Sequence, residues 1–149
     1  ALVMSEAANG GKKYRPYLVK DIIAPDGTVI KHFDPVVERD LNIDPSVISL
    51  VQEGLHEVST VGTAAAMFKD FPVPIAGKTG TAENSHGREH GWFVAYGPFD
   101  NPNIAVAVIV ENAGYGATSA VPIGYKILSA AFGLDKPKTP ENQPAPAQQ

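Results

Sequence analysis

The stretch Ala76–Asn84, AGKTGTAEN, decides how the rest of this chain is interpreted. Lys78 is followed by Thr79 and Thr81 on either side of Gly80, and the alternating hydroxyl side chains favour a strand. The glycine has no Cβ, so a backbone or a ligand can approach the strand closely at that point. Because a lysine stands two residues before the glycine, we expect the approaching group to be an anion.

Three strands are predicted in succession, over Ile75–Glu83, Gly91–Gly97 and Ile104–Glu111. The short connections between them favour an antiparallel meander over parallel crossovers. The third strand is apolar on both faces and is therefore expected at the centre of the sheet.

A hairpin is predicted upstream from two apolar, β-branched segments. Pro16–Ala24 alternates as a strand does, Pro25, Asp26 and Gly27 are typical of a turn, and Thr28–Phe33 returns. We interpret this hairpin as a structural arm in preference to a binding element.

Two longer helices are predicted before the sheet. Ala1–Asn9 is rich in helix formers and ends at a glycine pair. Asp44 and Pro45 are typical of a helix start. His56 is expected at the surface of that second helix, on the side away from its apolar stripe of Val47, Ile48, Val51, Leu55 and Val58.

Two further helices are expected to begin at hydroxyl side chains, which accept hydrogen bonds from the first N–H groups of a helix. Thr63 is expected to cap a short helix over Ala64–Phe68, and Ser119 a longer one over Ala120–Phe132. The longer helix should pack across the sheet through Val121, Tyr125, Leu128 and Phe132.

Composition narrows the possible functions. The chain has 149 residues, 44% of them apolar, which suffices for one domain or part of one. A net charge of −4 and the lack of a basic run argue against a nucleic-acid partner. The absence of cysteine excludes disulfides, thiolate metal sites and a cysteine nucleophile. No apolar run reaches membrane-spanning length, and the opening ALVMSEAANGG reads like the end of a helix, so we expect an upstream segment to be missing.

No motif predicts a cofactor or a metal. The GKT run is similar to the end of a phosphate-binding loop, but position 72, where that loop requires its first glycine, is Pro72. His86 and His90 have the spacing of a metal-binding pair, yet they lie in a glycine-containing loop without further ligands, so we interpret them as solvated. The glycine-rich Asn112–Gly116 lacks the dinucleotide-binding spacing.

A specific resemblance begins at Lys78–Gly80, because KTG is one of three signature motifs of penicillin-binding proteins and serine β-lactamases. The match continues through AGKTGTAE, the aromatic HGWFVAYGP, the apolar IAVAVIVEN, a glycine-rich loop and a last helix. Upstream, ANGGKKYRPYLVKDI resembles the segment that such enzymes carry after their second motif. Ala1–Leu134 thus resembles the C-terminal portion of a penicillin-binding transpeptidase domain, closest to the monofunctional class B enzymes of elongation, division or sporulation.

The resemblance implies an α/β (α+β) fold in which an antiparallel sheet is flanked by helices. Only the C-terminal part of that fold, residues 1–134, would be present here. Residues 135–149 are rich in Pro, Gln and Ala with little to bury, so we predict a disordered tail.

The resemblance also implies roles for the residues of the motif. Lys78 would supply positive potential for the carboxylate of a peptide or β-lactam and would influence proton transfer near the serine. The hydroxyls of Thr79 and Thr81 would bond that carboxylate, and the backbone N–H of Thr81 would be one oxyanion-hole donor. Gly80 would keep the strand edge open to the substrate.

Two of the family's motifs are absent from this sequence. None of its serines is followed by lysine three residues later, as the nucleophile's Ser-x-x-Lys motif requires, and no Ser-x-Asn motif occurs; the serines are Ser5, Ser46, Ser49, Ser59, Ser85, Ser119 and Ser129. The fragment is therefore expected to hold one wall of an acyl-transfer site and to be inactive alone.

The parent protein implied by the resemblance is a serine D,D-transpeptidase that crosslinks peptidoglycan stem peptides through an acyl-enzyme and is acylated by β-lactams. Besides stem peptides and β-lactams, the partner of this chain would be the missing N-terminal half of the domain, in the same protein or in a companion chain. A missing N-terminal segment would anchor it in the bacterial inner membrane, with the catalytic domain extracytoplasmic. Two alternatives stay open: a β-lactam-sensing domain without catalysis, and a D,D-carboxypeptidase or β-lactamase relative.

Overall fold

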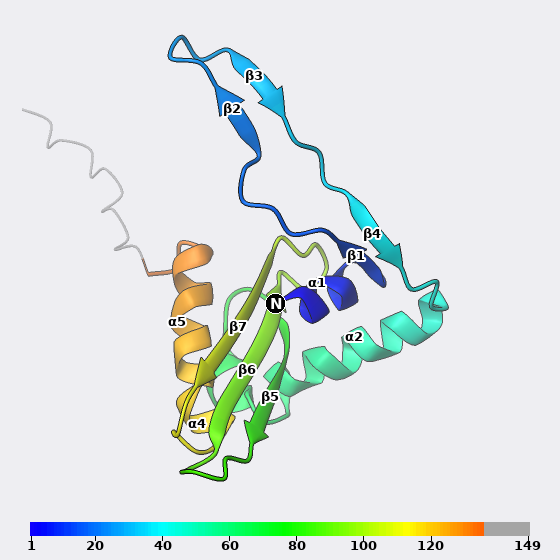
Figure 1. The fold of residues 1–149 in the computed structure, drawn as a ribbon. Helices are drawn as coiled ribbons and strands as arrows, with labels where there is room; N and C mark the ends of the chain where they lie inside the picture. The colour runs from blue at the N-terminus through cyan, green and yellow to red at the C-terminus, as the bar shows by residue number, and fades with distance from the viewer. Residues whose placement is uncertain (136–149) are drawn as a thin grey trace, which may run out of the picture.

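The computed structural model of the chain describes residues 1–135. Apart from its first residue, the tail predicted over 135–149 lies outside the described residues. The elements of Figure 1 are α1 Leu2–Ala8, β1 Lys12–Tyr14, β2 Asp21–Ile23, β3 Val29–His32, β4 Val37–Asp40, α2 Pro45–Thr60, α3 Ala65–Phe68, β5 Ala76–Ala82, β6 His90–Gly97, β7 Ile104–Val110, α4 Gly116–Ser119 and α5 Val121–Ala131.

A three-stranded antiparallel sheet, in the order β5-β6-β7, lies between helices (Figure 1). The predicted fold class and the antiparallel meander are confirmed. Among the described strands the prediction that the third strand is central is wrong, because β6 is the middle strand and β7 lies at an edge. Val106 and Val108 of β7 are buried while Ala107 and Ile109 are exposed, so only one face of this all-apolar strand is covered by the described residues.

The main core lies on the sheet face that carries Phe93 and Ala95. These side chains pack with Val106 and Val108 against α3 and α5, where Phe68 and the completely buried Leu128 belong to the same cluster. The predicted stripe of the last helix is therefore confirmed. A smaller cluster lies on the other sheet face beneath α1, formed by Met4, Ala76 and Tyr96.

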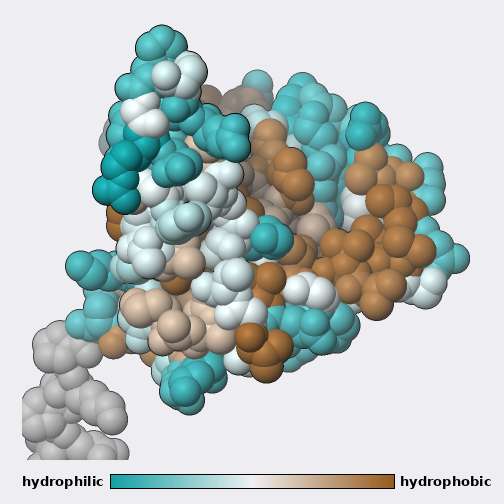
Figure 2. Space-filling model, turned by 90° about the horizontal axis from the view of Figure 1, so that it is seen from below, coloured by the Kyte–Doolittle hydropathy of each residue, from teal (hydrophilic) through white to brown (hydrophobic). Residues whose placement is uncertain are grey.

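Helix α2 begins as predicted, with the Asp44 side chain accepting a hydrogen bond from the backbone N–H of Ser46 at 2.8 Å. Its predicted stripe is only partly buried: Ile48 is covered, but Val47 and Val51 are about half exposed. Figure 2 shows apolar surface gathered on the side of the molecule where α2 lies. The helical pattern was correct, and no element of the described chain covers this part of it.

Three local predictions are corrected by tertiary contacts. Thr63 does not cap α3, whose N-cap is Ala64 without a side-chain hydrogen bond, and Ser119 likewise does not cap α5. The Ser119 hydroxyl instead donates to the carbonyl of Tyr115. His56 is partly buried, because its ring stacks on Phe99 with centroids 4.4 Å apart.

The predicted hairpin is confirmed as the antiparallel pair β2–β3, which projects from the rest of the molecule (Figure 1). Its base contains a second pair, β1–β4, which the sequence did not predict. Lys12 pairs with Asp40 and Lys13 with Arg39, and this pairing joins the two chain segments that lead into and out of the arm.

Candidate active-site strand

The KTGT motif lies on β5, the edge strand that is hydrogen-bonded to β6 on one side. Lys78 is paired with Val94, and Gly80 with Trp92. Because directly opposed residues share a sheet face, Lys78 and Gly80 lie on the Trp92 face, and Thr79 and Thr81 on the face of the main core.

On β5, the backbone N–H and C=O groups of the odd-numbered residues point to the outer edge, away from β6. The Thr79 carbonyl accepts a hydrogen bond from the Lys78 ammonium at 2.9 Å, and the Ile75 carbonyl accepts from α2. In an antiparallel strand the N–H and C=O of one residue point to the same edge, and residues two apart share that edge. The N–H of Thr81 therefore points outward as well, away from β6.

Lys78 and Thr81 are exposed on this edge, and Thr79 and Gly80 are half-buried. The bond from Lys78 to the Thr79 carbonyl holds the ammonium close to the hydroxyl-bearing part of the strand. The positive charge and the hydroxyls of Thr79 and Thr81 thus lie within four consecutive residues.

The hydroxyl of Thr79 is hydrogen-bonded to that of Thr63, with 2.6 Å between the two oxygens. Sequence reasoning assigned Thr63 to a helix cap and missed this contact. The only signal was a hydroxyl residue in a tight turn between two helices, and that pattern does not identify its partner.

Two glycines let the chain pack closely behind the motif. A Cβ on Gly80 would lie 3.2 Å from the Cβ of Trp92. A Cβ on Gly116, at the start of α4, would lie 2.4 Å from the carbonyl oxygen of Gly80 and 2.3 Å from that of Trp92. The glycine-rich segment before α5 therefore supports the motif strand by direct contact with its backbone.

The loops at the end of β5 and β7 are joined by hydrogen bonds. The Asn84 side-chain amide donates to the Asn112 side-chain oxygen at 2.6 Å, and the Asn112 backbone N–H donates to His90 Nδ1 at 3.0 Å. The His86 ring bonds to the neighbouring Ser85 and its backbone N–H donates to the Asn84 side chain, so the two histidine rings have different partners. Among the described residues no group of three potential metal ligands occurs.

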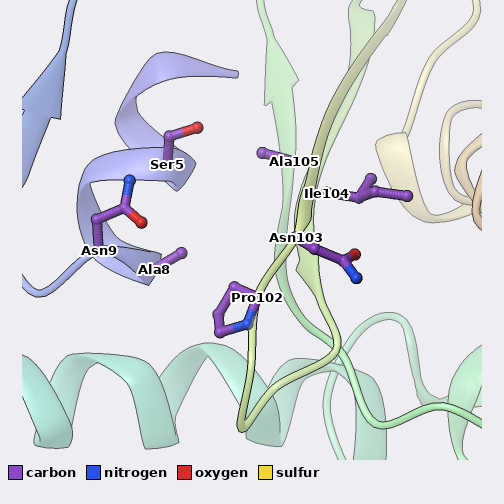
Figure 3. Close-up of a pocket in the computed structure, with 7 residues that line it drawn as sticks. All are labelled: Ser5, Ala8, Asn9, Pro102, Asn103, Ile104 and Ala105. Atoms are coloured by element: carbon purple, nitrogen blue, oxygen red, sulfur yellow. The ribbon is translucent and has the colours of Figure 1, made fainter. Parts of the chain in front are cut away.

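Several surface hollows of the described chain lie away from the motif strand. One, of about 140 Å³, lies between α1 and the start of β7 and is lined by Ser5, Ala8, Asn9, Pro102, Asn103, Ile104 and Ala105 (Figure 3). Its polar lining contains no charged or nucleophilic pair. Beyond its contacts with the end of α2 and the turn that follows, the outer edge of the motif strand is open, and it can bind a ligand in a cleft only when another surface faces it.

Comparison with known proteins identifies the family to which this chain belongs. Residues 1–129 match the model of the penicillin-binding protein transpeptidase domain, and the chain belongs to that family. It is 34% identical to the peptidoglycan D,D-transpeptidase MrdA of Haemophilus influenzae over 95% of this chain and 24% of the relative. It is also 34% identical to the peptidoglycan D,D-transpeptidase PbpA of Mycolicibacterium smegmatis, over 89% of this chain and 28% of the relative.

Solved structures agree with this assignment. A ceftriaxone acyl-enzyme complex of penicillin-binding protein A from Mycobacterium tuberculosis superimposes with a TM-score of 0.76 at 34% identity, over 88% of this chain and 31% of that one. Penicillin-binding protein 2B of Streptococcus pneumoniae gives a TM-score of 0.73 at 28% identity, over 93% of this chain and 24% of that one. The chain thus spans 24–31% of the length of these relatives. None of the described helices combines the length and the apolar character needed to cross a membrane.

Proposed function

We propose that this chain is the C-terminal portion, residues 1–134, of the catalytic domain of a peptidoglycan D,D-transpeptidase. In that enzyme it supplies the strand that binds the substrate carboxylate and the oxyanion. The observation that carries the proposal is the outer edge of β5, where the Lys78 ammonium, two threonine hydroxyls and an outward N–H occur together. The family match and the acyl-enzyme complexes of a relative support it.

Each group at this edge has a role in acyl transfer. Lys78 attracts the carboxylate of a stem peptide or β-lactam, and the hydroxyls of Thr79 and Thr81 donate hydrogen bonds to it. When the serine oxygen attacks the carbonyl carbon, the carbonyl oxygen gains negative charge. The N–H of Thr81 donates to that oxygen, and one such donor contributes about 3–4 kcal/mol to transition-state stabilisation. Gly80 leaves room for the ligand to lie along the edge as an added strand.

The nucleophilic serine is proposed to come from a segment outside this sequence. No serine here is followed by the lysine of the Ser-x-x-Lys motif. The relatives are about three to four times longer than the matched region, so they have room for the missing motifs. The segment would belong to the same protein or to a companion chain, and it would face the open edge of β5.

Localisation follows from the proposed substrate. Peptidoglycan stem peptides are crosslinked outside the cytoplasm, so the catalytic domain would work there, anchored to the inner membrane by a segment outside this chain. Stem peptides and β-lactams would be its ligands. The proposed chemistry requires no cofactor. The acidic composition argues against a nucleic-acid partner.

Labelling with a fluorescent penicillin tests the proposal. We expect the proposed full-length enzyme to be labelled covalently, and this chain alone to remain unlabelled because it lacks the nucleophile. Lys78→Ala in the full-length enzyme should slow acylation by at least about tenfold, the usual size of the loss of one charged contact. The matched control is Lys126→Ala, which removes an exposed lysine on α5, remote from β5, and should leave labelling unchanged.

Three results would contradict this function. Covalent label on a residue of the isolated chain would place the nucleophile within it. Labelling of the full-length enzyme without crosslinking of stem peptides would favour a β-lactam sensor, and release of the terminal residue by water alone would favour a carboxypeptidase.

A further inference from the structure

The end of α2 contacts the outer edge of the motif strand through three polar side chains. His56, Ser59 and Thr63 follow one another at intervals of three and four residues, which brings them to one side of the helix and its following turn. His56 Nδ1 and the Ser59 hydroxyl both bond to the carbonyl of Ile75, at 2.7 and 2.8 Å. Thr63 bonds to Thr79, four residues further along the same edge. The end of α2 and the turn that follows it therefore hold the motif strand and the residue before it on both sides of Gly77.

The turn that carries Thr63 is itself held by backbone hydrogen bonds. The N–H of Gly62 donates to the Glu57 carbonyl at 2.8 Å, and that of Ala64 donates to the Val58 carbonyl at 2.9 Å. Ala64 is buried in the main core, whereas the side chain of Thr63 projects from the turn and is exposed. The hydroxyl of Thr63 thus has a defined place, and it does not serve as a helix cap there.

A threonine hydroxyl has one proton and two lone pairs. In the proposed function the Thr79 hydroxyl donates its single proton to the ligand carboxylate. Its oxygen can then only accept from Thr63, so Thr63 must be the donor of the 2.6 Å bond in the ligand-bound state. Accepting that bond orients the Thr79 proton and makes the hydroxyl a stronger donor, because hydrogen bonds in a chain polarise one another.

We infer that Thr63 is a positioning residue of the transpeptidase site, which acts by orienting the hydroxyl of Thr79 toward the carboxylate of the ligand. The inference rests on the proposed function and extends it to a residue outside the motif. On this proposal Thr63 acts without touching the ligand, and its effect on the reaction passes through Thr79.

A double-mutant cycle in the proposed full-length enzyme tests this. The readout is the second-order rate constant for acylation by a penicillin, measured beside the melting temperature. Thr63→Val keeps the shape but cannot donate, and we expect a loss of about fivefold, the size of one neutral hydrogen bond. Thr63→Ser keeps the hydroxyl and should acylate at close to the wild-type rate. Thr79→Val should slow acylation, and adding Thr63→Val to it should slow it no further.

The matched control is Thr60→Val, one turn earlier, whose hydroxyl makes only a long 3.4 Å contact with the Glu57 carbonyl. It should change neither acylation nor melting. Acylation by Thr63→Val at the wild-type rate would overturn the inference, as would equal losses for Thr63→Val and Thr63→Ser. Losses that multiply in the double variant would also overturn it, since Thr63 would then act independently of Thr79. Normal acylation by Thr79→Val alone would instead refute the role of Thr79 in the proposed function.

Discussion

The β5-β6-β7 sheet and the arm formed by β2 and β3 are both rich in apolar, β-branched residues, yet only the sheet buries them. Phe93 of β6 is completely buried. Ile23 and Ile30, on the two strands of the arm, are 58% and 66% exposed. Strand residues of one chemical type thus have opposite environments in one chain.

The difference lies in what covers each pair of strands. The sheet has helices against it, so its alternating side chains enter a common core. The arm has strands of three and four residues, and a two-stranded hairpin of that size is marginally stable in water by itself. Local contacts shape it: the backbone N–H of Thr28 donates to the Asp26 carboxylate, which lowers the pKa of Asp26, and Lys31 lies over the ring of Phe33. The sheet therefore depends on burial, and the arm on turns and short-range pairs.

The largest effect is expected from removing a ring from the sheet. Phe93→Ala should lower the free energy of unfolding of the proposed full-length enzyme by about 3–5 kcal/mol, because the ring stacks on Phe68 and fills the space against Gly124. Urea denaturation measures this. The control is Ile109→Ala, on the face of β7 left exposed, which should cost less than about 1 kcal/mol. Equal losses for the two variants would show that the exposed face is covered in the full-length enzyme.

A pH-dependent effect is expected from the opposite face of the sheet. The Tyr96 hydroxyl is buried and has no hydrogen-bond partner among the described residues. Burial, together with the negative charge of Glu53, raises the pKa of Tyr96 to about 12. The folded chain therefore keeps a proton that the unfolded chain loses above about pH 10. This contribution to stability is fully present below pH 10 and is lost as the pH rises toward 12, by at most about 1.4 kcal/mol per pH unit.

Tyr96→Phe should remove that part of the alkaline decline and should change stability by less than about 1 kcal/mol at pH 7, since it deletes an unpaired polar group. The measurement is the free energy of unfolding at pH 7 and across pH 10–12. Tyr115→Phe is the control, because Tyr115 is exposed and its removal should leave the decline unchanged. An identical alkaline decline in wild type and Tyr96→Phe would refute the assignment.

Local sequence patterns predicted the elements of both regions, because alternation, turn residues and the Asp44 cap act within a few residues. The strand that carries Lys78 to Thr81 followed from the alternation and the motif. The pairing of Lys12 with Asp40 could not be predicted in this way. It joins two short polar segments that are far apart in the chain, and neither segment has an alternating pattern. The sequence also did not predict that β7 is at an edge of the described sheet. A strand that is apolar on both faces does not reveal which of those faces other elements will cover.

The partners of polar side chains were the least predictable feature of the candidate site. Thr63 has the residue type and position of a helix cap, and its hydroxyl bonds instead to a strand sixteen residues later. His56 lay on the polar side of its helix by sequence, and the fold brings Phe99 and the carbonyl of Ile75 to it. Such contacts depend on how α2 meets β5, which no local pattern contains.

The smallest effect is expected from the arm. Ile30→Thr should change the free energy of unfolding by no more than about 0.5 kcal/mol, because the side chain is already in water and threonine keeps the β-branch that strands favour. Val108→Thr makes a similar apolar-to-hydroxyl change in the buried sheet and should cost about 1–3 kcal/mol, since the hydroxyl is buried there. Comparing urea midpoints of the two variants in the proposed full-length enzyme measures the contrast directly. A loss in Ile30→Thr as large as that in Val108→Thr would mean that the arm is covered by a surface from outside this chain, and the arm would then depend on burial as the sheet does.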